Sequence, residues 1–250
     1  MSNVTTSTPA TLEKPYVVCH MSSSLDGRID CAMVDKLDHS NNYYDAMAKL
    51  NAPARICGKT TAAMHFALPE SFKNTSGKQI KDVADHKAFY QAPVDPKYPQ
   101  GAFSIVLDTK GTLTWENNIA DDLPLICVVS EQAAPEYLSY LESLNISWLV
   151  AGTDHIDIPL ALHHLKHDFG LAAITLVGGG HINGAFLQAK VIDEVSIIYT
   201  AGIDARAGFT SVFDGIKTDV SAEDYEPVKL KLQSITTIEN DAVWLRYKTI

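Results

Sequence analysis

The sequence predicts a single α/β domain with a central, mostly parallel sheet, helices on both faces of that sheet and an antiparallel edge at its C-terminal end. β-rich apolar runs alternate with helical segments from residue 16 to residue 200, as in parallel strands joined by crossover helices. The chain then ends in two β-rich runs around a turn at Asn240-Asp241, which indicates a hairpin. With 250 residues, 46% of them hydrophobic, the chain is long enough to bury one sizeable core.

The individual elements follow from short apolar runs and from the residues that begin or end them. Strands are expected at residues 16–21, 54–57, 104–108, 125–130, 146–150, 172–177, 191–200, 228–233 and 242–248. Helices are expected at residues 41–50, 59–66, 135–144 and 158–169, and after residue 180. Ser40 or Asn41 is the expected cap of the first helix, Pro135 begins the third and Gly170 closes the fourth.

Two segments do not fit this alternation. Residues 1–14 are rich in Ser and Thr without an apolar centre, so we expect a disordered leader and no signal peptide. Residues 67–100 are rich in Pro, Lys, Asp and Gln, and strand signals resume directly after them. We therefore expect residues 15–250 to form one domain with an insertion at about 67–100, which is a flap or lid rather than a linker.

The charge balance limits the classes of partner. A net charge of −10 argues against nucleic acid or an anionic membrane, because no basic field opposes phosphate repulsion. No apolar run approaches the ~20 residues of a membrane helix, so we expect a soluble, cytoplasmic protein with a small-molecule substrate. The four cysteines show no C-x-x-C spacing; Cys19, Cys57 and Cys127 fall in expected strands, where buried free thiols are usual, and Cys31 does not.

Three consecutive glycines, Gly178, Gly179 and Gly180, separate the expected strand at 172–177 from a helix. Glycines let the backbone approach a ligand closely, and a helix N-terminus directs unpaired N–H groups and the positive end of its dipole at a phosphate. A tight turn that needs glycine is the alternative. The Rossmann fingerprint is excluded, because its third glycine position is occupied by Asn183.

A second glycine lies between a strand and a helix at Gly58-Lys59-Thr60-Thr61. Lys59 supplies a positive charge and the two threonines supply hydroxyls, so this turn is a second candidate phosphate contact. It is not a P-loop, because that motif requires glycine where this chain has Pro53.

A polar loop at residues 22–29 follows the first strand and contains Ser24 and Asp26. Ligands of α/β folds bind just past the ends of strands, which makes this loop a candidate site. An ordinary Asp-Gly turn is the alternative. His163 and His167 lie one helical turn apart, but no carboxylate at H-E-x-x-H spacing joins them, so we expect a solvated helix face and no metal site.

Five short motifs occur in an order that resembles a known family. They are Ser24-Leu-Asp-Gly-Arg28, Gly58-x-x-Thr61, Asp108 at a strand end, Gly178-Gly-Gly-x-Ile-Asn183 and Val191-Ile-Asp-Glu194. Together they are similar to the reductase domain of riboflavin biosynthesis, the C-terminal half of a bifunctional deaminase–reductase, over roughly residues 15–249. The resemblance implies a dihydrofolate-reductase-like fold, a homodimer and hydride transfer from NADPH to the ribosyl C1 of a phosphoribosylamino-pyrimidine. No H-x-E with P-C-x-x-C occurs, so a stand-alone reductase is expected.

The resemblance also implies roles for particular positions. Gly178 to His181, flanked by Val177 and Ile182, would hold the cofactor pyrophosphate. Gly58, Lys59, Thr60 and Thr61 would hold the adenosine side, with Lys59 suited to the 2′-phosphate of NADPH. The Asp108 and Ile156 regions would line the cofactor groove. Ser24, Asp26 and His20 are the candidate catalytic residues beside the substrate, although Asp26 could instead only shape its loop.

Three departures from the family pattern keep other functions open. Val177 stands where the family commonly has Glu, His20 stands where it commonly has Lys, and a G-[ED]-S-x-W-I-T segment is missing, with residues 34–42 in its place. Two of these departures are at polar positions near the expected substrate, whereas the glycine motif expected to hold the cofactor is kept. The alternatives are a reductase of the same fold with a pterin-like, small carbonyl or imine substrate, and a non-catalytic NADP-binding protein.

Overall fold

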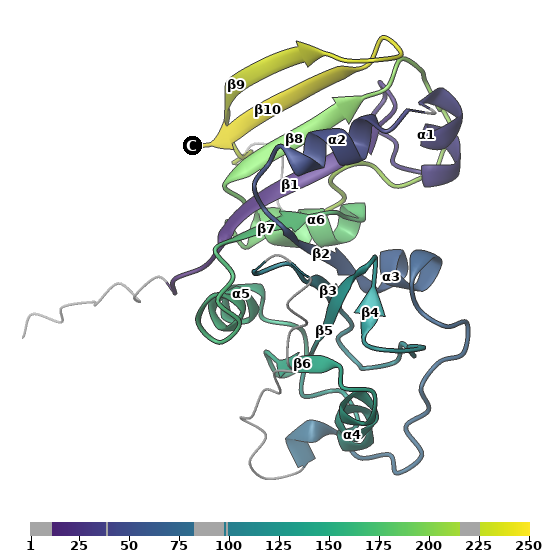
Figure 1. The fold of residues 1–250 in the computed structure, drawn as a ribbon, viewed down its shortest axis with the longest axis vertical. Helices are drawn as coiled ribbons and strands as arrows, with labels where there is room; N and C mark the ends of the chain where they lie inside the picture. The colour runs from purple at the N-terminus through teal and green to yellow at the C-terminus, as the bar shows by residue number, and fades with distance from the viewer. Residues whose placement is uncertain (1–11, 39, 83–97, 99, 216–225) are drawn as a thin grey trace, which may run out of the picture.

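The computed structural model describes residues 12–38, 40–82, 98, 100–215 and 226–250. Its core is one ten-stranded sheet in the order β4-β5-β3-β2-β7-β1-β8-β10-β9, with β6 paired to β5 (Figure 1). The strands are β1 Tyr16–Ser23, β2 Ala54–Gly58, β3 Ser104–Leu107, β4 Ile119–Ala120, β5 Leu123–Val129, β6 Ser147–Val150, β7 Ala173–Leu176, β8 Glu194–Tyr199, β9 Leu230–Thr237 and β10 Val243–Thr249.

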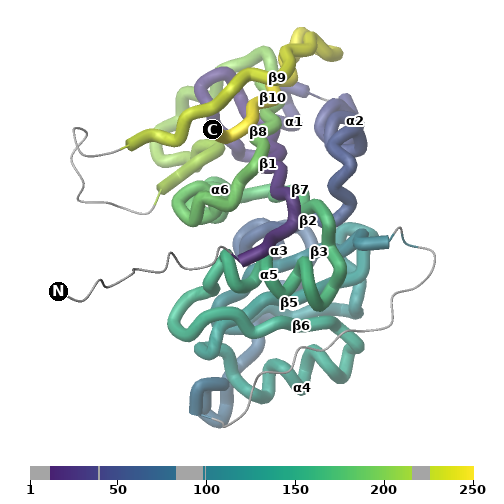
Figure 2. The backbone as a smooth tube through the Cα atoms, turned by 90° about the vertical axis from the view of Figure 1, so that its left-hand side faces the viewer, coloured from purple at the N-terminus to yellow at the C-terminus, as the bar shows by residue number. Residues whose placement is uncertain are grey.

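The pairing confirms the predicted sheet. All six pairs within β6-β5-β3-β2-β7-β1-β8 are parallel. The C-terminal pairs β8-β10 and β10-β9 are antiparallel, and both residues of the predicted turn, Asn240 and Asp241, have positive φ. The short strand β4 adds an antiparallel pair with β5 that the sequence did not indicate. β9 and α4 lie at opposite ends of the molecule in both views (Figure 2).

Helices cover both faces of this sheet, and Figure 2 shows α2 and α6 on opposite sides of the strands. The helices are α1 Cys31–Leu37, α2 Asn42–Ala48, α3 Lys59–His65, α4 Pro135–Ser143, α5 Ile158–His167 and α6 Gly180–Gln188, with a 3-10 turn at Ile80–Asp82. The predicted helix at 41–50 is thus slightly shorter, and α1, which was not predicted, begins at an Asp30 cap whose carboxylate accepts the N–H of Ala32.

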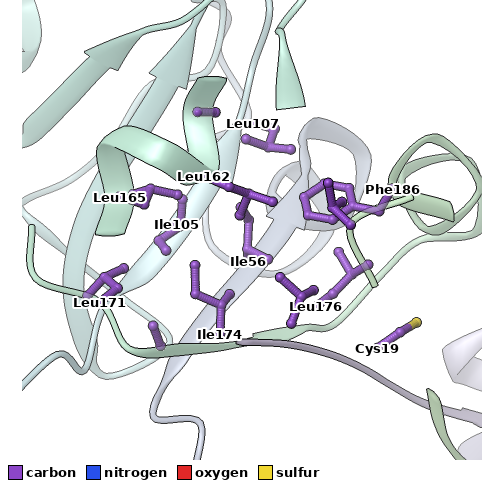
Figure 3. Packing of buried hydrophobic residues seen from close by; sticks show 14 of the residues in the cluster. Cys19, Ile56, Ile105, Leu107, Leu162, Leu165, Leu171, Ile174, Leu176 and Phe186 are labelled. Carbon is purple, nitrogen blue, oxygen red and sulfur yellow. The ribbon is translucent and has the colours of Figure 1, made fainter. Parts of the chain in front are cut away.

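Successive residues of a strand point to opposite faces of the sheet, so the buried residues form a cluster on each face. Ile56 and Ile105 point into the cluster that α5 and α6 cover (Figure 3), whereas their neighbours Cys57 and Val106 point into the cluster that α3 and α4 cover. The three cysteines of β1, β2 and β5 are buried free thiols, as predicted, and Cys31 is exposed. None of the helices in the described ranges is both long and apolar enough to cross a bilayer.

The two segments set apart in the sequence are only partly described. Most of the expected leader, residues 1–11, lies outside the described residues, and Lys14 forms an ion pair with Asp193. Within 67–100, Phe72 packs edge-on against Tyr137 of α4, and the N–H of Ile80 donates to the Ala133 carbonyl over 2.9 Å. Residues 83–97 and 99 lie outside the described part of the chain, so the lid stays a prediction.

Candidate functional site

The carboxyl ends of the parallel strands border one cavity of about 770 Å³, called the large cavity below. Its volume is typical of cofactor pockets, and ligands of open α/β sheets bind at this edge. The segments that follow β2, β3, β6 and β7 form its wall together with residues from the loops before and after them. Its wall residues include Met21, Gly58–Thr61, Asp108–Lys110, Val177 and Gly179–Ile182.

The two glycine-containing turns meet at this wall. The backbone N–H of Gly58 donates a hydrogen bond to the carbonyl oxygen of Gly178 over 3.1 Å. Gly178 has a φ of +100°, and the peptide bond from Gly178 to Gly179 is cis. A Cβ on Gly58 would lie 2.5 Å from Cγ1 of Ile182, so the close approach of α6 to β2 requires glycine there. Two turns that are 120 residues apart in the chain therefore build one wall.

The N-terminus of α6 is open toward the large cavity. Its cap residue, Gly179, has no side chain to satisfy the first N–H groups of the helix, and the first helical residues, Gly180 to Ile182, line the cavity. A Cβ on Gly179 would meet only the Thr61 hydroxyl, at 3.8 Å, whereas a Cβ on Gly180 would lie 2.2 Å from the Ser211 carbonyl oxygen. Gly180 is thus required by packing, and Gly179 leaves space on the cavity side. This arrangement suits an anion.

The side chains of the large cavity supply positive charge without an internal partner. Lys59 and Lys110 line it, and neither forms an ion pair with another described residue. The carboxylates of its wall are engaged: Asp30 pairs with Arg206 over 2.7 Å, Asp154 accepts from the side-chain amide of Gln132, and Asp108 accepts the N–H of Leu113 over 2.8 Å. Lys59 and Lys110 therefore remain available to a negatively charged ligand.

A second cavity of about 500 Å³, called the side cavity below, adjoins the large one. The two share six wall residues: Met21, Ile29, Cys31, Thr61, His65 and Val177. Beyond this common wall, the side cavity extends between α1, α2 and the start of β2, where Tyr43, Tyr44 and Arg55 line it. The contiguity lets a cofactor in one cavity face a second molecule in the other.

Most of the predicted cofactor residues lie together. The wall of the large cavity includes Gly58, Lys59, Thr60, Thr61, Asp108, Val177, Gly179, Gly180, His181 and Ile182. Gly178 contributes the carbonyl that holds the two turns together rather than a lining surface. Ile156 packs against the core instead, and its neighbours Asp154 and His155 line the cavity.

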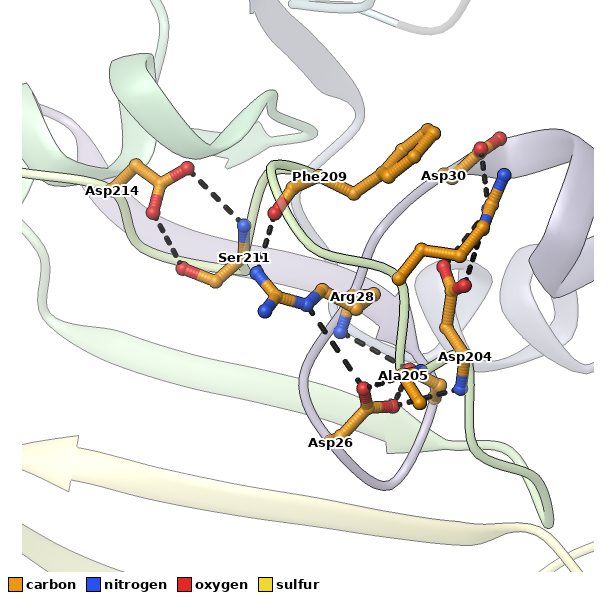
Figure 4. A network of polar contacts seen from close by, with 10 residues as sticks. Asp26, Arg28, Asp30, Asp204, Ala205, Phe209, Ser211 and Asp214 are labelled. Carbon is orange, nitrogen blue, oxygen red and sulfur yellow. Dashed lines mark hydrogen bonds and ion pairs between the residues drawn. The ribbon is translucent and has the colours of Figure 1, made fainter.

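The structure does not bring Ser24 and Asp26 to the wall of either cavity. The Ser24 hydroxyl donates to Oδ1 of Asp26 over 2.6 Å, and the two carboxylate oxygens of Asp26 accept the N–H groups of Asp204 and Ala205, each over 3.0 Å (Figure 4). The hydroxyl of Ser24 and these amide donors lower the pKa of Asp26 to about 2. In this arrangement Asp26 fastens its loop to residues 204–205, which is the loop-shaping alternative.

His20 is fully buried and lines neither cavity. Its ring nitrogens lie 2.9 Å from the Ser196 hydroxyl and 3.0 Å from the Tyr43 carbonyl oxygen, and its ring stacks on that of Tyr43 with centroids 4.6 Å apart. Burial lowers the pKa of His20 to about 4. The ring therefore serves as a neutral link between β1, β8 and α2.

Several wall residues were not predicted. Cys31 and His65 come from α1 and α3, and Cys31 Sγ lies 4.0 Å from His65 Nε2 at the wall that both cavities share. No local motif marks either residue. Lys110 had a usable signal, because it follows Asp108 just past a strand end.

The predicted histidine surface on α5 is partly paired. His164 Nδ1 lies 2.6 Å from the Asp168 carboxylate, and His167 Nε2 lies 3.6 Å from that of Glu13. No group of three or more His, Cys, Asp or Glu side chains in the described part of the chain is arranged to hold a metal ion.

Solved structures of similar fold include proteins named as pyrimidine reductase-like or as riboflavin biosynthesis reductases. A pyrimidine reductase-like protein from Corynebacterium diphtheriae superimposes with a TM-score of 0.65 at 15% identity, covering 94% of this chain and 92% of that one. Acinetobacter baumannii RibD gives 0.64 at 19% identity, covering 95% and 58%. The riboflavin biosynthesis reductase Rib7 of Saccharomyces cerevisiae gives 0.57 at 13%, covering 98% and 93%. At these identities the likeness establishes the fold, which is the dihydrofolate-reductase-like fold expected from the motifs.

Sequence comparison gives a local relative and a family. A 2,5-diamino-6-ribosylamino-4(3H)-pyrimidinone 5′-phosphate reductase from Aquifex aeolicus is 28% identical over 78 residues, which are 31% of this chain and 34% of that protein. The match thus spans about a third of this curated relative. The sequence model of the RibD C-terminal domain matches residues 15–244, nearly the whole chain. On that match, the chain belongs to the RibD C-terminal domain family.

Proposed function

We propose that this protein is an NADPH-dependent reductase that binds the dinucleotide in the large cavity and a small-molecule substrate in the side cavity. The observation that carries the proposal is the common wall of the two cavities. It lies next to a helix N-terminus without a side-chain cap and next to two lysines that form no ion pair within the described part of the chain. When bound, the nicotinamide supplies the hydride. The protein supplies position, charge and exclusion of water.

The residues present fit a dinucleotide. The N–H groups at the start of α6 and the open side of Gly179 suit the pyrophosphate. Beside them, Lys59, Thr60 and Thr61 begin α3, and Lys110 follows β3. We assign the 2′-phosphate of NADPH to Lys59 and Lys110, because an ammonium group without a partner gains most from a phosphate.

The common wall defines where hydride transfer would occur. Met21, Ile29 and Val177 present apolar side chains that keep water away from the transferring atoms. His65 is the titratable nitrogen at this wall, and it can hold or deliver a proton to the reduced substrate. Ser24, Asp26 and His20 then act through the fold, by fixing the loop and the strands behind this wall.

Two substrate classes compete for the side cavity. The Aquifex relative is named for a ribosylamino-pyrimidinone 5′-phosphate, so reduction of that compound at the ribosyl C1 is the first candidate. The second candidate is a different substrate of the same fold, such as a pterin-like, carbonyl or imine compound. It is favoured by Val177, an apolar residue at the common wall where the family motif commonly has a carboxylate, and by the burial of His20 away from both cavities.

We also propose a homodimer. β9 is the edge strand of the sheet, and its side chains are exposed along nearly the whole strand, including Leu230, Leu232 and Ile235, whose residues are 40%, 46% and 62% exposed. Exposed apolar side chains on an edge strand offer a surface on which another chain can pack. Light scattering of the purified protein tests this: a mass of twice the 27.3 kDa chain supports the dimer, and a monomer at micromolar concentration contradicts it.

The first experiment for the proposed function is a calorimetric titration with NADPH, NADP+ and NADH. A ligand that binds only the native state at a hundredfold excess over its dissociation constant stabilises the protein by about 2.7 kcal/mol, so thermal shifts provide a second readout. Binding of NADPH that is lost in Gly179→Asp supports the dinucleotide site. Oxidation of NADPH by a pyrimidine or pterin substrate then separates a reductase from a non-catalytic binding protein. If no nicotinamide cofactor binds, the proposal is wrong.

A further inference from the structure

The side cavity differs from the large cavity in the charge that it offers a ligand. Three carboxylates line it, those of Asp35, Asp38 and Asp121, and its one arginine is Arg55. The Arg55 guanidinium forms an ion pair with Asp121 and is thus already neutralised. Among the described residues of its wall, no lysine is present. Among the described wall residues, a phosphate in this cavity would therefore find no lysine or arginine that is free of an ion pair.

The remaining two carboxylates reinforce this difference. Asp38 accepts hydrogen bonds from Ser40, Asn42 and Asn240, and these donors hold its pKa below the usual range, so it stays ionised at neutral pH. Asp35, at the exposed side of α1, forms no ion pair with any described residue. Among the described wall residues, the side cavity therefore has two carboxylates without an ion pair and no lysine, whereas the large cavity has Lys59 and Lys110 beside its carboxylates.

The wall of the side cavity also has polar residues, Ser22, Ser40 and Thr61, and a large apolar and aromatic part. Met21, Val34, Met47 and Val177 supply aliphatic surface. Tyr44 contacts Tyr43 edge to face, with ring centroids 5.2 Å apart, and is 53% exposed. Such a wall buries the faces of a flat ring, while its carboxylates can accept hydrogen bonds from ring N–H or amino groups.

We infer that the substrate of the side cavity is an unphosphorylated, neutral or protonated nitrogen heterocycle, and that phosphate groups are confined to the large cavity. The inference rests on the proposed function, because it assumes that the large cavity holds the dinucleotide. The reduction balances without a phosphate: a substrate carbon with a double bond to nitrogen or oxygen gains the hydride, the heteroatom gains a proton from water or His65, and NADPH becomes NADP+. A negative field favours a substrate that is protonated before the hydride arrives.

A matched pair of ligands tests the inference on the intact protein. The probes are 2,5-diamino-6-ribosylamino-4(3H)-pyrimidinone and its 5′-phosphate, titrated calorimetrically into protein saturated with NADP+. We expect the unphosphorylated compound to bind at least about tenfold more tightly, a difference of about 1.4 kcal/mol. Equal or tighter binding of the 5′-phosphate would overturn the inference, and so would a failure of both compounds to bind.

Charge reversal at Asp35 provides the internal check. Asp35→Lys adds a cation beside the cavity and should reduce the tenfold preference to about threefold or less, because it removes a repulsive charge and adds an attractive one. The matched control is Glu142→Lys, the same charge change on α4, which lines neither cavity and should keep the preference. An unchanged preference in Asp35→Lys would contradict the assigned cause. Titration with NADP+ alone comes first, so that loss of the proposed function is seen separately from a preference for the phosphate.

Discussion

Oγ1 of Thr61 lies 3.8 Å from the position that a Cβ on Gly179 would occupy, and no other atom outside the neighbouring residues lies within 4 Å of it. Gly179 has a φ of −71°, which L residues adopt freely. The chain itself thus leaves room for a methyl group at this position. A glycine that packing does not require, at the cap of a helix facing a cavity, is explained by a ligand that approaches the backbone closely.

Gly179→Ala is therefore expected to fold normally and to bind NADPH at least about tenfold more weakly, since the methyl group occupies pyrophosphate space. Gly180→Ala is the matched control. Its Cβ would lie 2.2 Å from the Ser211 carbonyl oxygen, so we expect a loss of stability of about 1–3 kcal/mol. Urea unfolding and NADPH titration of both variants check this. Unchanged NADPH affinity in Gly179→Ala would show that the N-terminus of α6 does not hold the pyrophosphate.

Lys59 is expected to separate NADPH from NADH. Lys59→Gln removes a cation that has no ion-pair partner among the described residues, so we expect NADPH binding to weaken about tenfold, or about 1.4 kcal/mol, with NADH binding nearly unchanged. The double variant with Lys110→Gln should bind the two cofactors alike. Lys248→Gln, an exposed lysine on β10 outside the cavity, is the control. An equal loss of affinity for NADPH and for NADH would show that Lys59 does not bind the 2′-phosphate.

Sequence patterns predicted the fold well because strand ends and glycine turns are local signals. The turns at Gly58 and Gly178 were each predicted between a strand and a helix, and the hydrogen bond between them shows that they lie side by side. The helix α1 was missed although Asp30 is a typical cap residue, because its seven residues are too few to show a helical periodicity. The strand β4 was missed because it has only two residues.

The positions of the catalytic candidates were harder to predict, because the face of the sheet to which a side chain points depends on the register of its strand. Met21 lines both cavities, so the preceding residue, His20, points to the opposite face of β1. Cys31 and His65 are 34 positions apart in the sequence, and only the fold brings the first residue of α1 close to the last residue of α3. The charge of the side cavity likewise depends on which partners Arg55 and Asp38 find in three dimensions.

Cys31 offers a direct report on occupancy of the site. It is the one exposed cysteine, and it lines both cavities, whereas the other three cysteines of the chain are buried. We expect iodoacetamide to label the native protein at Cys31 alone. Labelling should be slow, because partial burial of the thiol together with the charges of Asp35 and Asp30 raises its pKa. NADPH should slow labelling in proportion to its occupancy. Peptide mapping by mass spectrometry checks the site, and equal labelling rates with and without NADPH would contradict it.

Asp26 is expected to act on stability rather than on chemistry. Asp26→Asn replaces one carboxylate oxygen by an amide donor that faces the N–H of Asp204 or Ala205. The loop therefore loses one of these two hydrogen bonds. We expect a lower melting temperature and, at a temperature where the variant is folded, a kcat close to that of the wild type. A large fall in kcat with unchanged melting temperature would restore the catalytic role.

His20 is expected to make the protein sensitive to acid. The pKa of His20 is about 4 in the folded protein, below its ordinary value of 6.5, so the unfolded chain binds the proton more tightly. Stability therefore rises with pH between about 4 and 6.5, and the contribution of this one ring amounts to about 3 kcal/mol across that range. Above pH 6.5 the contribution is fully present, and it is lost as the pH falls toward 4.

Urea unfolding at several pH values between 4.5 and 7 measures this contribution. His20→Gln loses the stacking on Tyr43, where the centroids lie 4.6 Å apart, and is expected to be less stable at every pH. Its free energy of unfolding should nevertheless change less steeply with pH than that of the wild type. The difference in slope corresponds to the uptake of up to one proton on unfolding, because glutamine has no group that titrates there. The carboxylates contribute equally to both proteins, so the difference in slope isolates the imidazole. Parallel curves for the two proteins would show that His20 is protonated as easily in the folded chain as in the unfolded one, and the neutral link between β1, β8 and α2 would be wrong.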